Sequence, residues 1–462
     1  MFLRNIHIQF SNLFVLLIIS LTFSALSASL IFLIPIFVVL GWLIFQKRSV
    51  IVGATLVGYL TATSKYTGDL RIYLNILLTI IIIYLFLKEY GFAFHKYPKV
   101  PKIVIYFVLL MSFCLLIASL ISIDPQTSLI PLITTIFFFT ICYLFYSMLK
   151  TIEDVYTLIF SIIISTFVLS ISIFIDFISL GPAVFFVRGM LSNEIELSSM
   201  IRYTEYVVFF ISLSFLISFY LIKQNSSNKF KITITFLVLL NLIILIFANS
   251  RGSLGAAVIS ILFIFIYYFR KKIFTYLIVI SALILIAYSS IPILEESTEA
   301  YLRLGTVSER ELFWNSGVEI FKDFPIFGIG PNLYPLYFAS YAPPGVYEHI
   351  GFDKITNPTP HNLFLRYAAE TGSLGLIVPI FFFIMYFSIS VKTLSLTKNS
   401  SREYYILTIT ATGIGIAMFL RSFIEVTGIL AYGYLTLDLP FWIVVVIMIF
   451  IYQKFRLNNY NA

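Results

Sequence analysis

The segment best suited to proton transfer is Asn357-Pro358-Thr359-Pro360-His361-Asn362. Thr359 followed by Pro360 is typical of an N-cap and a first helical residue, which predicts a helix that runs to Glu370. His361 would then lie in the first turn, where the positive end of the helix dipole disfavours imidazolium and keeps the ring neutral. We therefore interpret His361 as a candidate proton acceptor. The alternative is a histidine with a purely structural role.

Arginines in apolar surroundings are the second candidate group. The planar guanidinium binds two phosphate oxygens at once and loses its water more readily than an ammonium group. Arg421 and Arg202 each have an acid within one helical turn, Glu425 and Glu205, so ion pairing is an alternative account of both. Arg251 has no acid nearby, and the glycine after it leaves room for a ligand. Arg251 is therefore the best candidate for binding an anion.

The elements that must position these residues are membrane helices. The chain is 60% hydrophobic and only 11% charged, whereas soluble domains are roughly 25% charged. Apolar runs long enough to span a bilayer recur along it. They predict one all-α integral membrane domain, 1–462, with about 14 transmembrane helices at 11–26, 29–46, 49–63, 72–88, 103–122, 129–148, 155–179, 201–222, 232–249, 254–269, 273–292, 373–391, 404–429 and 436–452.

The distribution of positive charge predicts how this bundle is oriented. With both termini in the cytoplasm, 19 of the 30 basic residues lie in inner loops and tails, as the positive-inside rule requires. The net charge of +8 therefore reflects topology, and we expect no nucleic-acid partner. The remaining basic residues are mostly arginine, which favours an anionic ligand at the outer face over chance and structural pairing: Arg71, Arg188, Arg202, Arg251, Arg303, Arg310, Arg366 and Arg421.

The long segment 293–372 lies outside in this orientation. Ser308 and Glu311 form a capping box that predicts a helix starting near Glu309, with an apolar stripe and an end at Asp323-Phe324-Pro325. Such an amphipathic helix would lie on the membrane surface or cover the bundle. Gly328-Ile329-Gly330-Pro331 predicts a turn, because no strand precedes it as in a nucleotide-binding loop. We expect short helices of this extracytoplasmic loop to carry part of the active site.

Several common cofactor motifs are absent from the sequence. There is no Asp-x-Asp pair, no Cys/His cluster with metal-ligand spacing, and no Walker A sequence. We therefore expect no metal and no cofactor. An enzyme acting outside the cell without nucleotides needs an activated donor that is already in the membrane.

The order of these motifs resembles that of the O-antigen ligase and O-antigen polymerase superfamily. The resemblance extends over 250–375 and includes Ser250-Arg251-Gly252, Arg310 with Trp314, Pro325-x-x-Gly328-x-Gly330-Pro331, His361-Asn362, and Glu370-Thr371-Gly372 with Gly375. Arg188 with Asn193 is similar to a further element of the family.

The resemblance implies a GT-C-like, inverting and metal-independent glycosyltransferase. Its donor would be a glycan on undecaprenyl diphosphate, and its acceptor another glycan, lipid A core or protein. Arg251 and Arg310 would hold the diphosphate, and His361 would take the proton of the acceptor hydroxyl. The implied substrate-binding residues are Arg188, Arg202, Arg421 and Asn362.

The expected location is the cytoplasmic membrane, with the site facing the periplasm or cell exterior. Membrane lipids and polysaccharide-assembly proteins are the other expected partners. Polymerase is slightly favoured over ligase because it needs no lipopolysaccharide core. Two other classes stay open, a transporter or flippase of the same lipid-linked glycan and a structural partner in an envelope complex. A transporter would typically show paired repeats and interrupted helices, which we do not find in the sequence.

Overall fold

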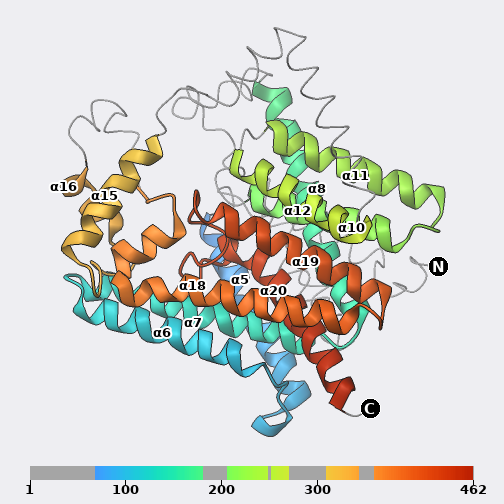
Figure 1. The fold of residues 1–462 in the computed structure, drawn as a ribbon, viewed down its shortest axis with the longest axis horizontal. Coiled ribbons are helices and arrows are strands. Elements are labelled where there is room, and N and C mark those ends of the chain that lie inside the picture. Colours follow the sequence, from blue (N-terminus) through green and yellow to red (C-terminus); the bar gives the residue numbers. More distant parts are fainter. Residues whose placement is uncertain (1–67, 181–204, 248–250, 270–308, 343–357, 461–462) are drawn as a thin grey trace.

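The computed structural model describes residues 68–180, 205–247, 251–269, 309–342 and 358–460 (Figure 1). These residues fold into α-helices joined by loops, as predicted. The helices are α5 (Gly68–Tyr90), the short 3-10 helix η3 (Phe94–Lys96), α6 (Lys102–Ile121), α7 (Pro125–Met148), α8 (Ile152–Leu180), α10 (Glu205–Ile222), α11 (Asn228–Phe247), α12 (Arg251–Phe269), α15 (Glu309–Asp323), α16 (Tyr334–Tyr341), α18 (Leu363–Thr397), α19 (Arg402–Arg421) and α20 (Leu435–Tyr460).

Seven of the described helices are long and apolar enough to cross a membrane: α6, α7, α11, α12, α18, α19 and α20. The chain is therefore an integral membrane protein. Four predicted spans, 11–26, 29–46, 49–63 and 273–292, lie outside the described residues, so the total of 14 and the GT-C-like fold stay predictions.

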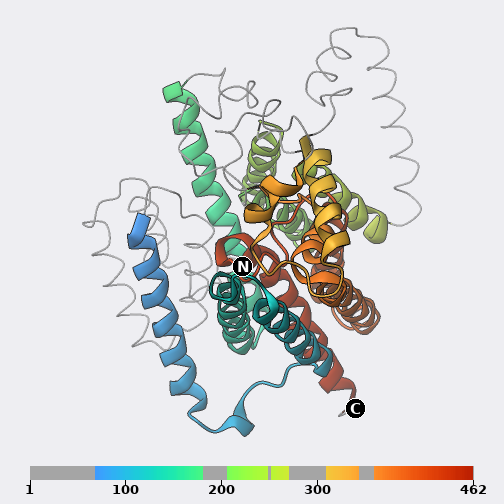
Figure 2. The same ribbon diagram turned by 90° about the vertical axis from the view of Figure 1, so that its left-hand side faces the viewer.

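Aromatic rings hold the centre of the bundle together. Phe107 of α6 lies with its ring centroid 5.4 Å from that of Phe382 of α18 and 6.0 Å from that of Trp442 of α20. Figure 1 shows α6, α7 and α18 running side by side, with α10, α11 and α12 grouped beyond α19. In Figure 2, α5 runs along one flank, where it packs on α7. The apolar faces predicted from sequence therefore form a continuous core.

The predicted helix 404–429 is too long, because α19 ends at Arg421. Residues 422–434 instead form a loop that leads back to the start of α20. This loop contains Val426, Ile429 and Leu430, which are as buried as core residues of a helix. Because these residues are as apolar as those of a membrane span, the sequence pattern predicts that the helix continues, although the backbone has left the helix.

Helix α18 is interrupted at Gly372, where φ is 67° and ψ is −166°. This region of backbone space is essentially restricted to glycine. The break confirms the predicted helix end at Thr371-Gly372, and a second helical stretch continues to Thr397. The interruption leaves backbone groups without partners inside the helix, and another segment of the chain must supply them.

The segment Pro325–Pro331 supplies those partners by crossing α18 at the break. Backbone N–H groups of Ile329 and Gly330 donate to the carbonyl oxygens of Ala369 and Glu370 at 3.1 and 2.9 Å. In return, Ser373 N–H donates to Pro325 O at 2.8 Å. The predicted turn around Gly328-Ile329-Gly330-Pro331 is therefore a crossing element built for close backbone approach.

Glycine is required on both sides of this crossing. A Cβ atom at Gly328 would lie 2.3 Å from the carbonyl carbon of Glu370, and one at Gly372 would lie 2.2 Å from that of Ile326. The turn between α6 and α7 supports the crossing from below, since Ser122 Oγ donates to Ile329 O at 3.1 Å. The two backbones therefore contact each other with no room for side chains.

The amphipathic helix predicted to begin near Glu309 is present as α15, Glu309–Asp323. Its buried face includes Phe313 and Ile320, and Gly317 lies directly against Leu365 of α18. Together with α16 it stands at the end of the bundle where α18 begins (Figure 1). Of the two predicted placements for this helix, covering the bundle fits these contacts.

Replacing Gly372 with alanine should destabilise the protein much more than replacing Gly91. Gly91 also has positive φ, at 63°, but nothing lies within 4 Å of an added Cβ there. We expect Gly91→Ala to cost roughly 1–2 kcal/mol for its backbone conformation alone. Gly372→Ala adds a backbone clash and should exceed about 4 kcal/mol. Thermal unfolding of the two purified variants in detergent measures this difference, and equal unfolding midpoints would contradict the crossing.

Candidate functional site

His361 lies just before α18 and not in its first turn as predicted. Its backbone is left-handed, with φ of 46°, and the helix starts at Leu363. The N-cap is Asn362, whose Oδ1 accepts a hydrogen bond from Leu365 N at 3.0 Å, so Thr359 does not cap this helix. An asparagine oxygen caps a helix as well as a threonine oxygen, which is why the sequence allowed both choices.

The His361 ring meets Arg310 at a shared carboxylate, that of Glu425. Nδ1 of His361 lies 3.3 Å from Oε2 of Glu425, and Nη2 of Arg310 lies 3.7 Å from the same oxygen. The three side chains come from the start of α18, from α15 and from the loop 422–434. Phe313 of α15 packs on the imidazole, with ring centroids 5.6 Å apart. Two predicted site residues that are 51 positions apart in sequence are therefore brought together.

Glu425 is held in its ionised form. Burial raises the pKa of its carboxyl, but the hydrogen bond with His361 and the charges of His361, Arg421 and Arg310 outweigh burial and bring the pKa to about 2. An ionised carboxylate only accepts hydrogen bonds, so the proton in the contact sits on Nδ1 of His361. In the neutral imidazole, Nε2 then carries a lone pair that can accept a proton.

Arg421 acts on Glu425 through its charge, and its hydrogen bonds go to another residue of the loop. Its guanidinium donates to the backbone oxygen and the Oγ1 of Thr427, the latter at 3.3 Å. The predicted pairing of Arg421 with Glu425 through one helical turn is therefore wrong, because the helix ends at Arg421 and the loop carries Glu425 toward Arg310. Buried Nε of Arg421 makes no hydrogen bond to the described residues.

The remaining predicted arginines are placed only in part. Arg251 is the first residue of α12, and its side chain lies outside the described part of the chain. Its neighbour Gly252 packs close to Ile424, where an added Cβ would lie 3.4 Å from Cδ1. This contact brings the start of α12 to the residue before Glu425. Arg188 and Arg202 lie outside the described residues.

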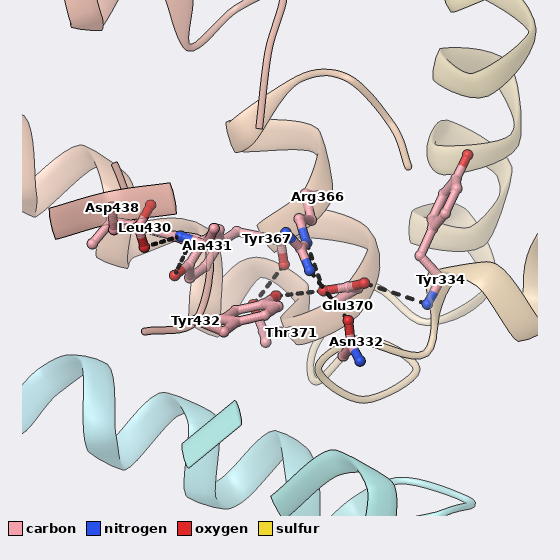
Figure 3. Close-up of polar contacts among 10 residues, drawn as sticks. All are labelled: Asn332, Tyr334, Arg366, Tyr367, Glu370, Thr371, Leu430, Ala431, Tyr432 and Asp438. Atoms are coloured by element: carbon pink, nitrogen blue, oxygen red, sulfur yellow. Dashed lines mark hydrogen bonds and ion pairs between the residues drawn. The ribbon is translucent and has the colours of Figure 1, made fainter. Parts of the chain in front are cut away.

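A second polar cluster lies deeper in the bundle (Figure 3). Arg366 Nε donates to Glu370 Oε2 at 3.2 Å, and both side chains are buried. The same carboxylate accepts the hydroxyl of Tyr432 at 2.5 Å and the backbone N–H of Tyr334 at 3.3 Å. The Arg366 guanidinium also lies over the Tyr432 ring, 4.4 Å from its centroid. All these groups are satisfied within the protein, so the cluster is a structural clamp.

This clamp fixes the loop that carries Glu425. Tyr432, near the end of the loop, is tied to Glu370, and Tyr367 donates to Leu430 O at 3.2 Å. The carboxylate of Asp438 accepts the backbone N–H of Ala431 at 2.6 Å. The backbone groups of a buried loop need such partners because water cannot reach them. The two polar clusters are therefore linked by one loop.

Sequence reasoning did not identify Glu425 or Glu370 as site or support residues. A usable signal was present, since both are acids inside segments that are otherwise apolar, where an unpaired charge is costly. Helical spacing could have paired Glu370 with Arg366, because the two are four residues apart on one helix. It could not have found the partners of Glu425, which come from other segments.

Replacing Glu370 with glutamine should destabilise the protein strongly. The change leaves the buried Arg366 without its counter-charge, which typically costs about 3–5 kcal/mol. Lys322→Gln is the control, because it removes an exposed pair with Glu319 on α15 and such pairs contribute roughly 0–1 kcal/mol. Unfolding midpoints in detergent test this, and a Glu370→Gln midpoint close to the Lys322→Gln midpoint would show that the clamp is not structural.

Part of the chain is similar to a known protein family. Residues 236–380 match the family model described as O-antigen ligase. The matched region runs from α11 to the first half of α18, and it contains Arg310, His361 and the Pro325–Pro331 crossing. No curated protein matches the chain. The match confirms the resemblance indicated by the motifs, in that residues 236–380 are similar to the O-antigen ligase family.

Proposed function

We propose that this protein is a glycosyltransferase that moves glycan from an undecaprenyl diphosphate donor to a glycan or lipid acceptor. The observation that carries the proposal is the convergence of Arg310 and His361, both inside the region that matches the O-antigen ligase family, on Glu425 of the loop 422–434. An anion-binding fork and a proton acceptor then lie side by side at one end of a membrane bundle. A transfer from a phosphate leaving group needs both.

The reaction follows from the positions of these groups. The acceptor hydroxyl oxygen attacks the anomeric carbon of the donor sugar, and its proton passes to Nε2 of His361. The bond between that carbon and the phosphate oxygen breaks, and its electron pair leaves with the diphosphate. Attack opposite the leaving group inverts the anomeric configuration. Because side chains accept the proton and stabilise the negative charge on the diphosphate, we propose that this step uses no metal and no cofactor.

Arg310 is 38% exposed, which lets its guanidinium reach a ligand. It would stabilise the negative charge that develops on the departing diphosphate. Arg251 is the proposed second diphosphate ligand, since α12 begins beside Ile424. Arg188, Arg202, Arg421 and Asn362 stay proposed substrate contacts, and Asn362 also serves as the N-cap of α18.

The proposed setting is the outer face of the cytoplasmic membrane. Donors carried on a polyprenyl chain would reach the site through the bilayer, and the segment 293–372 would face the periplasm or cell exterior. Polymerase activity is proposed ahead of ligase activity because it requires no lipopolysaccharide core. Other polysaccharide-assembly proteins are the expected neighbours.

Replacing His361 with alanine should abolish long surface glycan chains, because the acceptor hydroxyl loses its base. Lipid-linked units should accumulate on the outer face. The measurement is a size-resolved gel of cell-surface glycan, after checking that the variant reaches the membrane at the wild-type level. His95→Ala in η3 is the matched control and should leave the glycan pattern unchanged. Lipid-linked units trapped inside the cell would point to transport and contradict transfer.

Arg310→Lys should lower transfer by about 100-fold, because the lysine keeps the charge but loses the two-pronged hydrogen bond. Lys322→Ala on the same helix is the control and should transfer normally. Initial rates in membranes with lipid-linked donor give the comparison. Wild-type rates for Arg310→Lys would rule out a bidentate diphosphate contact.

A further inference from the structure

One carboxylate oxygen of Glu425 contacts both the proposed base, His361, and the proposed diphosphate ligand, Arg310. Oε2 of Glu425 accepts from Nδ1 of His361 at 3.3 Å and faces Nη2 of Arg310 at 3.7 Å. The Glu425 side chain is 17% exposed, whereas His361 and Arg310 are 28% and 38% exposed. The shared acceptor is therefore more enclosed than either of its two donors.

Three charged or titratable side chains surround this oxygen, and they come from three different helices or their ends. Arg310 approaches from α15, His361 from the start of α18, and Arg421 from the end of α19. Arg421 is already committed to Thr427 through both terminal nitrogens. Phe313 covers one side of the imidazole and carries no charge. The ion pair of Arg310 with Glu425, at 3.7 Å and with the Arg310 side chain 38% exposed, is the contact that an incoming anion can weaken.

We propose that Glu425 is a positioning residue that couples donor binding to the basicity of His361, an inference that rests on the proposed function. Without donor, the positive charge of Arg310 lies beside Glu425 and weakens its pull on the imidazole. A bound diphosphate competes for the Arg310 guanidinium. The Glu425 charge is then offset less by Arg310, and it favours the imidazolium that forms as the acceptor hydroxyl loses its proton.

This coupling works in both directions, as any binding linkage must. Diphosphate binding strengthens the base, and protonation of His361 strengthens diphosphate binding. Glu425 also keeps the Nδ1 proton in place, so that Nε2 is the nitrogen presented to the acceptor.

The ionisation of His361 can be measured without any transfer reaction. Diethyl pyrocarbonate modifies neutral imidazole, so the modification rate against pH gives a midpoint for each histidine. The purified full-length protein in detergent is labelled with and without inorganic pyrophosphate, and the peptide containing His361 is quantified by mass spectrometry. His95 in η3, at the far end of the bundle, is the internal control in the same digest.

Two substitutions should move the His361 midpoint in opposite directions. Glu425→Gln removes the negative charge and should lower the midpoint by about one pH unit. Arg310→Gln removes the positive charge that opposes it and should raise the midpoint. In the wild type, pyrophosphate should raise the midpoint, and this response should shrink in both variants. A general loosening of the site would shift both variants the same way, so opposite shifts identify the charge coupling.

Equal midpoints in wild type and Glu425→Gln would overturn the proposal, as would a wild type whose midpoint ignores pyrophosphate. If Glu425→Gln does not elute as a folded monodisperse species, Arg310→Gln and the wild-type response decide the question. Failure of the proposed function is separate. It would appear as normal surface glycan in His361→Ala cells, whatever the midpoints are.

Discussion

The crossing of α18 by the segment Pro325–Pro331 is the constraint on which the site depends. A helix interrupted in a membrane protein must have its exposed backbone groups satisfied by protein. Here the partner is a segment of turns that exchanges hydrogen bonds with Ala369, Glu370 and Ser373. Because Gly328 lies against the backbone of Glu370 and Gly372 against that of Ile326, these two contacts set the register of the crossing. That register fixes α15, which ends just before the crossing, and so fixes Arg310 relative to His361.

Buried carboxylates then hold the opposite wall of the site. Glu370 and Asp438 each accept hydrogen bonds from the loop 422–434, through the Tyr432 hydroxyl and the Ala431 N–H. This loop would otherwise be an irregular backbone in apolar surroundings, which is unfavourable without such partners. With its far end secured, the loop presents Glu425 at its near end. The stability of the bundle and the geometry of the site are therefore linked through a loop of apolar composition.

The sequence predicted what short-range patterns control. Apolar runs gave α6, α7 and α11 to within a few residues, the charge and stripe pattern gave α15, and Thr371-Gly372 gave the break in α18. It could not predict the loop 422–434, because burial by other helices makes its composition equal to that of a span. The N-cap of α18 was wrong for a related reason, since Thr359 and Asn362 are equivalent caps until the left-handed His361 is known. Arg310 and His361 were identified, but the carboxylate that joins them comes from a third segment.

The contrast between Arg366 and Arg310 shows why burial decides which arginine can bind a ligand. Both were predicted to face outward, and both have a glutamate partner. Arg366 is enclosed by Glu370, Tyr432 and Asn332. If the Arg366 guanidinium bound another anion instead, the buried Glu370 carboxylate would be left unpaired, at a cost of several kcal/mol. Arg310 is more than one third exposed, at 3.7 Å from its partner, and solvent screening makes such a pair weak. An ion pair that exchanges readily suits a site that must bind and release a diphosphate, and a pair that cannot exchange suits a clamp.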